Sequence, residues 1–170
     1  MTTPTKRPTV FVLDDHRVYL DLETFYLSQT HRYLVKKFNK GMDLLNKLTM
    51  KPDIVVLDYY LQENGKEETS LGILKKIKEE NPDTFVVMLT KDDKRETIIN
   101  CIKTGAYDYV VKNENAFITI ENILNNISHV LFAKREAKFQ KRMTRNMMIF
   151  VGVIVVVAAI IFWLVNGSFF

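Results

Sequence analysis

Short apolar runs alternate with segments of helical periodicity along the first 130 residues of this chain. Five runs have the character of strands, at residues 9–13, 33–38, 53–58, 85–90 and 107–112. Apolar residues recur at helical spacing between and after them, in residues 16–28, 42–49, 71–79, 94–104 and 116–131. Continuous apolar strands are typical of a parallel sheet that helices cover on both faces. The alternation of five strands with five helices predicts a doubly wound α/β fold.

A different pattern follows this domain. Residues 147–165 contain no charged side chain. As a helix they would span about 28 Å, close to the roughly 30 Å hydrocarbon core of a bilayer. Such a helix satisfies its own backbone hydrogen bonds in lipid, and Trp163, near its far end, suits the membrane interface. The sequence therefore predicts one transmembrane helix, in preference to a strand or a buried core helix.

The net charge of +4 is concentrated just before the apolar segment. Six basic residues there are accompanied by one acid, Glu136, so this segment carries +5 and the rest of the chain −1. The basic residues are Lys134, Arg135, Lys138, Lys141, Arg142 and Arg145. Because basic residues beside a span stay on the cytoplasmic side, we expect a single-pass protein of the cell membrane with its domain in the cytoplasm. In this position the basic run fits anionic lipid headgroups better than nucleic acid.

The patterns predict five parts. They are a polar N-terminal tail (1–8), the α/β domain (9–130), a basic juxtamembrane segment (131–146), the transmembrane helix (147–165) and a short outer tail (166–170). The N-terminal tail has no apolar stretch, so we expect no cleaved signal peptide. The single cysteine, Cys101, lies in a helical pattern and is expected to be a small buried hydrophobe.

Polar side chains stand where the predicted strands end. Asp14 and Asp15 follow the first strand, Asp58 ends the third, Thr90 the fourth and Lys112 the fifth. The carboxyl ends of parallel strands meet at one edge, where open α/β sheets bind their ligands. Three carboxylates together favour a divalent cation, and oxygen ligands suit Mg²⁺. A lysine and a hydroxyl beside them could hold phosphoryl oxygens, which completes the groups needed for phosphoryl transfer to a carboxylate.

This set resembles the receiver domain of two-component response regulators, over about residues 9–130. The family pattern is an acidic pair after strand one, an acceptor Asp after strand three, a Ser or Thr after strand four and a Lys after strand five. An aromatic residue three positions before the lysine is also usual, and Tyr109 stands there. The resemblance implies a flavodoxin-like sheet with strand order 2-1-3-4-5. It also implies a phosphoprotein that acts in phosphorelay signalling with a histidine kinase or phosphotransfer protein as donor.

The resemblance assigns a role to each residue of the acidic edge. Asp58 would attack phosphorus and become an aspartyl phosphate. Asp15 and Asp58 would bind Mg²⁺ directly, Asp14 through water, and the backbone carbonyl of Tyr60 would be a further ligand. The remaining roles concern the switch: Lys112 would pair with the phosphoryl oxygens, Thr90 would swing toward them and Tyr109 would rotate inward.

Four departures from the family pattern accompany this match. Asn113 stands where a proline often follows the lysine, and Lys91 stands where a small residue commonly follows the threonine. The segment 62–70 after the acceptor is longer than usual, and Ser70 takes the place of the usual glycine. These changes bear on the efficiency of switching and on the lifetime of the phosphoryl group.

Other functions would require different residues or leave Asp58 unmodified. A degenerate receiver that acts as a phosphorylation-independent docking module at the membrane is the main alternative, and a mainly structural anchor is related to it. An aspartate-nucleophile phosphatase usually carries a second Asp two positions after the first, where Tyr60 stands here. A Rossmann oxidoreductase would need a glycine-rich turn after the first strand, and no such turn follows it here. We therefore expect a signalling domain and not an enzyme, apart from slow self-dephosphorylation.

The three histidines add no metal site to this prediction. His31 and His129 are far in sequence from the acidic residues, and His16 is expected to begin a helix. No helix-turn-helix pattern follows residue 130, so output through a membrane partner or through a homodimer is expected instead of DNA binding. If the last helix continues into the membrane, switching at Tyr109 could change how two such helices pair.

Overall fold

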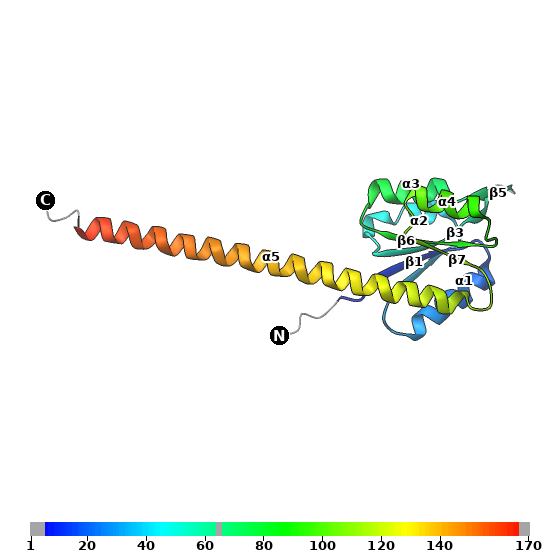
Figure 1. The fold of residues 1–170 in the computed structure, drawn as a ribbon, viewed down its shortest axis with the longest axis horizontal. Helices are drawn as coiled ribbons and strands as arrows, with labels where there is room; N and C mark the ends of the chain where they lie inside the picture. The colour runs from blue at the N-terminus through cyan, green and yellow to red at the C-terminus, as the bar shows by residue number, and fades with distance from the viewer. Residues whose placement is uncertain (1–5, 64–65, 167–170) are drawn as a thin grey trace. The chain divides into compact units, whose positions relative to one another are not determined.

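The computed structural model of the chain describes residues 6–63 and 66–166. The chain forms two compact units, Met1–Ser128 and His129–Phe170, drawn in Figure 1. The first unit contains the sheet and its helices, and the second is helical.

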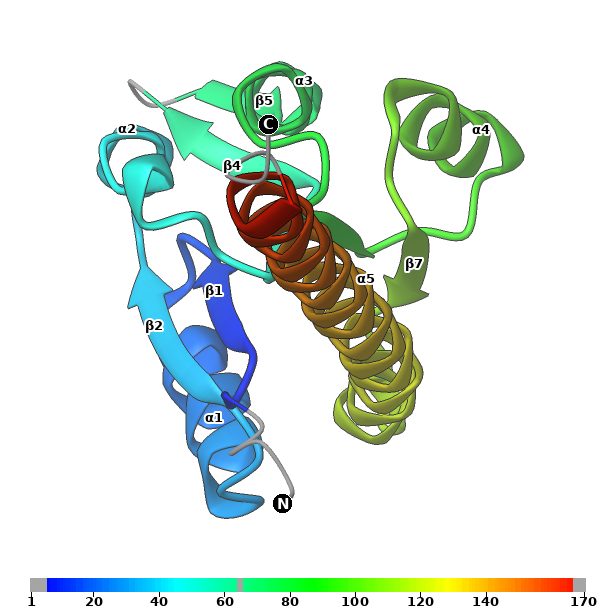
Figure 2. The ribbon, with the colours of Figure 1, turned by 90° about the vertical axis from the view of Figure 1, so that its left-hand side faces the viewer.

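A five-stranded parallel sheet is the centre of the first unit. Its strands are β1 (Thr9–Leu13), β2 (Leu34–Phe38), β3 (Ile54–Asp58), β6 (Phe85–Thr90) and β7 (Asp108–Val111). Their spatial order is β2-β1-β3-β6-β7, with β2 and β7 at the edges (Figure 2). This confirms the predicted sheet and its 2-1-3-4-5 order. The fourth and fifth strands of the sheet are β6 and β7, because β4 and β5 form a separate hairpin. Every residue of β3 is buried, as expected for a central strand.

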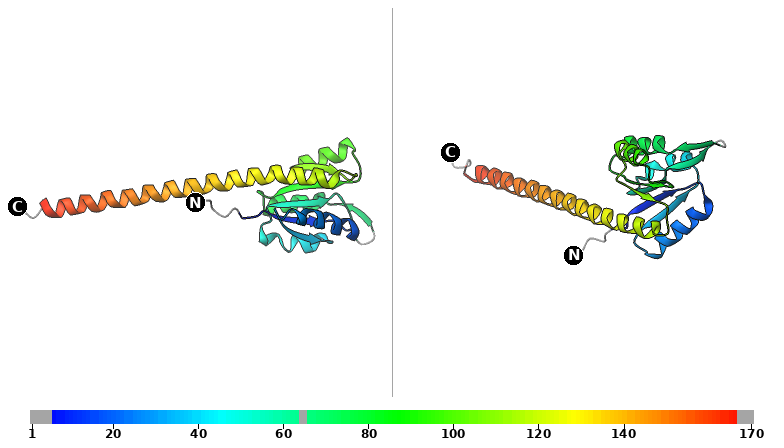
Figure 3. Two further views of the ribbon diagram at one scale, coloured as in Figure 1. Left: turned by 90° about the horizontal axis from the view of Figure 1, so that it is seen from below. Right: turned by 45° about the vertical axis from the view of Figure 1, so that its right-hand side comes forward.

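Helices cover both faces of this sheet (Figures 1 and 3). On one face lie α1 (Arg17–Gln29) and the first turns of α5, which begins at Ala116. On the other lie α2 (Gly41–Leu45), α3 (Leu71–Glu80) and α4 (Arg95–Thr104). His16 begins α1 as expected, since its ring Nδ1 accepts a hydrogen bond from the backbone N–H of Tyr19 at 3.4 Å. Cys101 is buried, also as expected.

One helical prediction needs correction, and one confirmed helix has its apolar residues on two faces. The segment 42–49 was predicted as one helix, but it forms the short α2 and a separate 3₁₀ turn, η1 (Leu48–Met50). This arrangement still buries Leu44 and Leu48. In α1 the buried residues are Leu20, Glu23 and Leu27, whereas Leu22 and Phe25 are largely exposed. The apolar residues of α1 therefore lie on two faces, and only one of them packs on the sheet.

The segment after Asp58 was predicted as a long loop but folds as a β-hairpin. Strands β4 (Tyr60–Glu63) and β5 (Lys66–Thr69) pair antiparallel, with Tyr60 opposite Thr69. The hairpin is anchored at its base, because Leu61 is buried in the core cluster and Ser70 N–H donates to the carbonyl of Tyr59 at 2.8 Å. Its sequence is rich in Glu and Lys, which have low strand propensity, so composition does not reveal it.

The second unit consists of the rest of α5, which runs from Ala116 to Asn166. Its apolar residues from Met147 to Phe162 are mostly exposed. Within the described residues this helix is long and apolar enough to cross a membrane, by length and composition. The side chain of Trp163, the first five residues and the predicted tail after Asn166 lie outside the described part.

Candidate functional site

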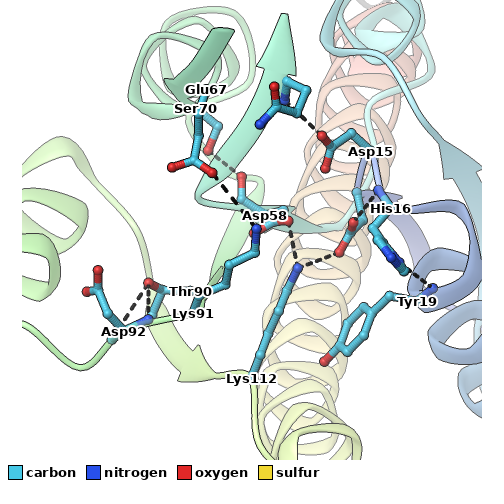
Figure 4. A network of polar contacts seen from close by, with 12 residues as sticks. Asp15, His16, Tyr19, Asp58, Glu67, Ser70, Thr90, Lys91, Asp92 and Lys112 are labelled. Carbon is cyan, nitrogen blue, oxygen red and sulfur yellow. Dashed lines mark hydrogen bonds and ion pairs between the residues drawn. The ribbon is translucent and has the colours of Figure 1, made fainter. Parts of the chain in front are cut away.

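The carboxyl ends of four parallel strands bring the candidate residues to one edge of the sheet (Figure 4). Asp14 and Asp15 follow β1, Asp58 ends β3, Thr90 ends β6 and Lys112 follows β7. Since β3 lies between β1 and β6, Asp58 stands between the acidic pair and the threonine. The side chain of Asp58 is 1% exposed, so its carboxyl is almost fully removed from bulk water.

Lys112 is the cation that compensates these buried acids. Its Nζ donates to Asp14 Oδ2 at 2.7 Å and to Asp58 Oδ2 at 2.6 Å. Burial alone would lower the pKa of Lys112, but these hydrogen bonds outweigh it and raise the pKa. Burial raises the pKa of Asp58 to about 6; Lys112 opposes this rise, and the charges of Asp14 and Asp15 add to it. Lys112 is therefore the group that favours the ionised form of Asp58.

The acidic cluster has the donor set of a divalent-cation site. One carboxylate oxygen from each of Asp14, Asp15 and Asp58 lies within 4.8 Å of the others. Asp58 Oδ1 is buried and has no hydrogen-bond partner among the described residues. A buried carboxylate oxygen is costly without a partner, and clustered carboxylates are the ligands that Mg²⁺ prefers. The residues thus fit a bound Mg²⁺ ion, with Asp58 Oδ1 as one candidate ligand atom.

Backbone groups orient the two acids after β1. His16 N–H donates to Asp14 Oδ1 at 2.8 Å, and Gln62 N–H, from the hairpin, donates to Asp15 Oδ2 at 2.8 Å. Ser70 Oγ donates to the carbonyl of Asp58 at 2.6 Å and is itself buried. The hairpin and the residue that follows it, Ser70, therefore contact Asp15, a predicted metal ligand, and the end of β3. Tyr60, whose carbonyl is the predicted further ligand, is the first residue of β4.

The predicted switch residues occupy neighbouring strands. Thr90 is 1% exposed, and its hydroxyl donates to the carbonyl of Asp92 at 3.1 Å. Tyr109 lies on β7, partly buried and packed against the core cluster. Asn113 and Lys91 flank the site as the sequence indicates, and Lys91 Nζ lies 3.9 Å from Glu67 Oε2 of the hairpin.

Two residues of α1 belong to the surroundings of this site and were missed by sequence reasoning. The Tyr19 ring centroid lies 4.5 Å from Lys112 Nζ, a cation–π contact. Glu23, one helical turn later, is 1% exposed, and neither of its carboxylate oxygens has a hydrogen-bond partner among the described residues. Burial raises the pKa of Glu23 to about 8; Asp14 adds to the rise and Lys112 opposes it. The spacing of Leu20, Glu23 and Leu27 could have placed this acid on the buried face.

Comparisons with known proteins agree with this geometry. The family model for the response regulator receiver domain matches residues 10–124, and the chain belongs to that family. The nitrogen assimilation regulatory protein NtrX of Azorhizobium caulinodans is 34% identical over 95 residues. That match covers 56% of this chain and 20% of the relative, so the chain spans about a fifth of the relative's length.

Solved structures give the same result. NtrX from Brucella abortus, crystallised with ATP, superimposes with a TM-score of 0.67 at 26% identity, covering 78% of this chain and 29% of that one. The Vibrio cholerae chemotaxis protein CheY4 superimposes with a TM-score of 0.63 at 21% identity, covering 72% and 99%. The second likeness concerns the fold alone.

Proposed function

We propose that this chain is a membrane-anchored response regulator whose Asp58 accepts a phosphoryl group from a histidine kinase or phosphotransfer protein. The observation that carries the proposal is the state of the Asp58 carboxylate. One of its oxygens is held by Lys112 at 2.6 Å, and the other is buried with no hydrogen-bond partner among the described residues. A carboxylate held in this way presents one oxygen to an incoming phosphorus atom, while the lysine is in place for the charge that arrives with it.

The acids around Asp58 are suited to hold the metal ion that the family uses. Asp15 and Asp58 would ligate Mg²⁺ directly, Asp14 would act through water, and the Tyr60 carbonyl would complete the protein's share. When bound, Mg²⁺ would neutralise the charge that gathers on the phosphoryl oxygens. Lys112 keeps Asp58 ionised before the reaction and pairs with the phosphoryl group after it.

Switching would follow from the new charge. Thr90 would leave its contact with Asp92 and donate to a phosphoryl oxygen, and Tyr109 would rotate inward behind it. This is a local electrostatic event that biases a two-state element. The chain would transmit this change by partner binding and would not turn over an external substrate, apart from slow self-dephosphorylation.

The membrane anchor is supported by the apolar part of α5 and by the charges before it. The six basic residues from Lys134 to Arg145 are followed by an uncharged helix through Phe162. We expect the basic side chains to contact anionic lipid headgroups and to keep the receiver domain in the cytoplasm.

The continuous helix also supports pairing of two copies. Phe139, Met143 and Phe150 recur at spacings of four and seven residues, and each is about half exposed or more. Spacings of four and seven residues are those of the apolar positions in parallel paired helices. Disulfide crosslinking through cysteines introduced at these positions would test whether two copies pair. An identical crosslinking pattern with and without a phosphoryl analogue would contradict a change of pairing on switching.

A second candidate is a docking module that never takes phosphate. Lys91, beside Thr90, and the hairpin after Asp58 are the features that favour it, because both place extra groups around the acceptor. It predicts that Asp58→Asn has no effect on signalling in the cell.

Intact mass spectrometry separates the two candidates. The full chain in detergent micelles is incubated with Mg²⁺ and acetyl phosphate, beside Asp58→Asn and beside wild type with excess chelator. We expect a gain of one phosphate in wild type with Mg²⁺ and none in either control. No gain in a wild-type sample with a native circular dichroism spectrum would favour the docking module.

A further inference from the structure

Asp92 lies in the segment between β6 and α4. It forms hydrogen bonds with Thr90 at the end of β6, with Tyr60 on β4 and with Lys94 at the start of α4. Its backbone carbonyl accepts the Thr90 hydroxyl at 3.1 Å, and its N–H donates back to Thr90 Oγ1 at 3.3 Å. Its carboxylate accepts from the Tyr60 hydroxyl at 3.0 Å, which reaches across from β4. The same carboxylate accepts from Lys94 N–H, at the start of α4, at 3.2 Å. Figure 4 shows Thr90 and Asp92 joined beside the acceptor.

These contacts make Asp92 a competitor for the switch hydroxyl. A threonine hydroxyl has one proton to donate, and here the proton goes to the Asp92 carbonyl. Donation to a phosphoryl oxygen on Asp58 requires that this bond break. When Thr90 turns, the segment that carries Asp92 therefore loses this anchor, and a shift of its backbone would carry the Asp92 carboxylate with it.

The hairpin is fixed to the core at its base, and two side chains link it to the β6–α4 segment. At the base, Ser70 and Leu61 are buried, and Ser70 Oγ holds the Asp58 carbonyl. One link is the Tyr60–Asp92 hydrogen bond, also at the base, where Tyr60 pairs with Thr69. The other is the ion pair of Glu67, on β5, with Lys91. The ion pair is half exposed and long, at 3.9 Å, so it contributes little. The hydrogen bond to a charged carboxylate is the stronger link.

We propose that Asp92 is a positioning residue for Thr90, and that it transmits the state of the switch through Tyr60 to the β4–β5 hairpin. Without phosphate, Asp92 holds Thr90 away from Asp58 and holds the hairpin against the β6–α4 segment. When Thr90 turns to a phosphoryl group, the Tyr60–Asp92 bond is lost and the hairpin loosens. The hairpin then becomes a second surface that reports phosphorylation. This inference rests on the proposed phosphorylation of Asp58.

Hydrogen–deuterium exchange of the full chain in detergent micelles tests the proposal. Peptides that cover residues 59–70 are followed with Mg²⁺ alone and with Mg²⁺ plus beryllofluoride, a phosphoryl analogue. Tyr60→Phe removes the hydroxyl and keeps the ring and the backbone carbonyl. Tyr107→Phe is the matched control, since the Tyr107 ring packs on Phe85 away from the hairpin. Bound beryllofluoride is measured independently by ¹⁹F NMR.

In wild type and Tyr107→Phe, beryllofluoride should speed exchange of the hairpin amides about tenfold, the effect of losing one hydrogen bond to a charged group. Tyr60→Phe should exchange at the fast rate already without beryllofluoride. Asp92→Ala should behave like Tyr60→Phe, whereas Asp92→Asn, which keeps an acceptor for Tyr60, should restore the wild-type response.

Two results would overturn the inference in distinguishable ways. If beryllofluoride binds and hairpin exchange in wild type is unchanged, the hairpin is not coupled to Thr90, while phosphorylation of Asp58 stands. If beryllofluoride does not bind at all, the proposed function fails and the inference fails with it.

Discussion

Glu23 shows how a single buried acid can make stability depend on pH. Its carboxyl has a pKa of about 8 in the folded chain, against 4.5 for the exposed group. Between these values the folded state keeps a proton that the unfolded state releases, so stability is lost as pH rises from about 5 to 8. Each unit of pKa difference corresponds to about 1.4 kcal/mol. Glu23 therefore lowers the free energy of unfolding at neutral and alkaline pH.

Glu23→Gln should remove most of this dependence. We expect the free energy of unfolding of the variant to rise relative to wild type by a few kcal/mol between pH 5 and pH 8. Guanidinium unfolding of the full chain in micelles, followed by circular dichroism at both pH values, measures the difference. Glu79→Gln on the exposed side of α3 is the control. Parallel pH profiles for wild type and Glu23→Gln would refute the assignment of this cost to Glu23.

Lys112 stabilises the folded chain, whereas Glu23 destabilises it, because the charge of Lys112 compensates two buried carboxylates. Lys112→Met leaves Asp14 and Asp58, each 1% exposed at the side chain, without a cation. Removal of one partner from a buried ion pair typically costs about 3–5 kcal/mol. We expect a loss of this size in metal-free buffer, and a smaller loss in the double variant Lys112→Met with Asp58→Asn. Equal losses in the single and double variants would contradict the coupling.

At the scale of the element, one glycine ends α4 in a conformation that other residues rarely adopt. Gly105 has φ +109°, and a Cβ there would lie 3.3 Å from Lys78 Cγ. Gly105→Ala should therefore destabilise the chain by about 1–2 kcal/mol. Gly72, in α3, has open space around its Cα, so Gly72→Ala should stabilise by about 0.5–1 kcal/mol. Thermal unfolding of both variants checks the pair, and a shift of the same sign in both would be inconsistent with this account.

The strands were predictable because their apolar runs are long and buried on both faces, as in β3 and β6. The acidic edge followed from parallel topology, which places strand ends together whatever the loops do. The hairpin was not predictable, because its residues are polar and its stability comes from backbone pairing and from Leu61. Glu23 and Asp92 were missed for a related reason. Their roles depend on contacts with distant residues, which no local pattern records.

At the scale of the whole molecule, the two units carry separate predictions. The anchor predicts that the full chain stays with the membrane after extraction with alkaline carbonate. Replacing Val153 and Val157 with Arg should release it, because charged side chains near the centre of a span are costly. Matched replacement by Leu should leave it in place. Release of the wild-type chain under the same conditions would contradict the transmembrane assignment and would leave the receiver domain unaffected.

The central claim is that Asp58 carries an acyl phosphate, and borohydride trapping tests it most directly. The full chain is incubated with Mg²⁺ and acetyl phosphate, reduced with sodium borohydride and digested for peptide mass spectrometry. Reduction converts an aspartyl phosphate to homoserine, so the account predicts homoserine at position 58 and unchanged Asp14 and Asp15. Homoserine at another position, or unmodified Asp58 in a folded protein that does bind Mg²⁺, would contradict it.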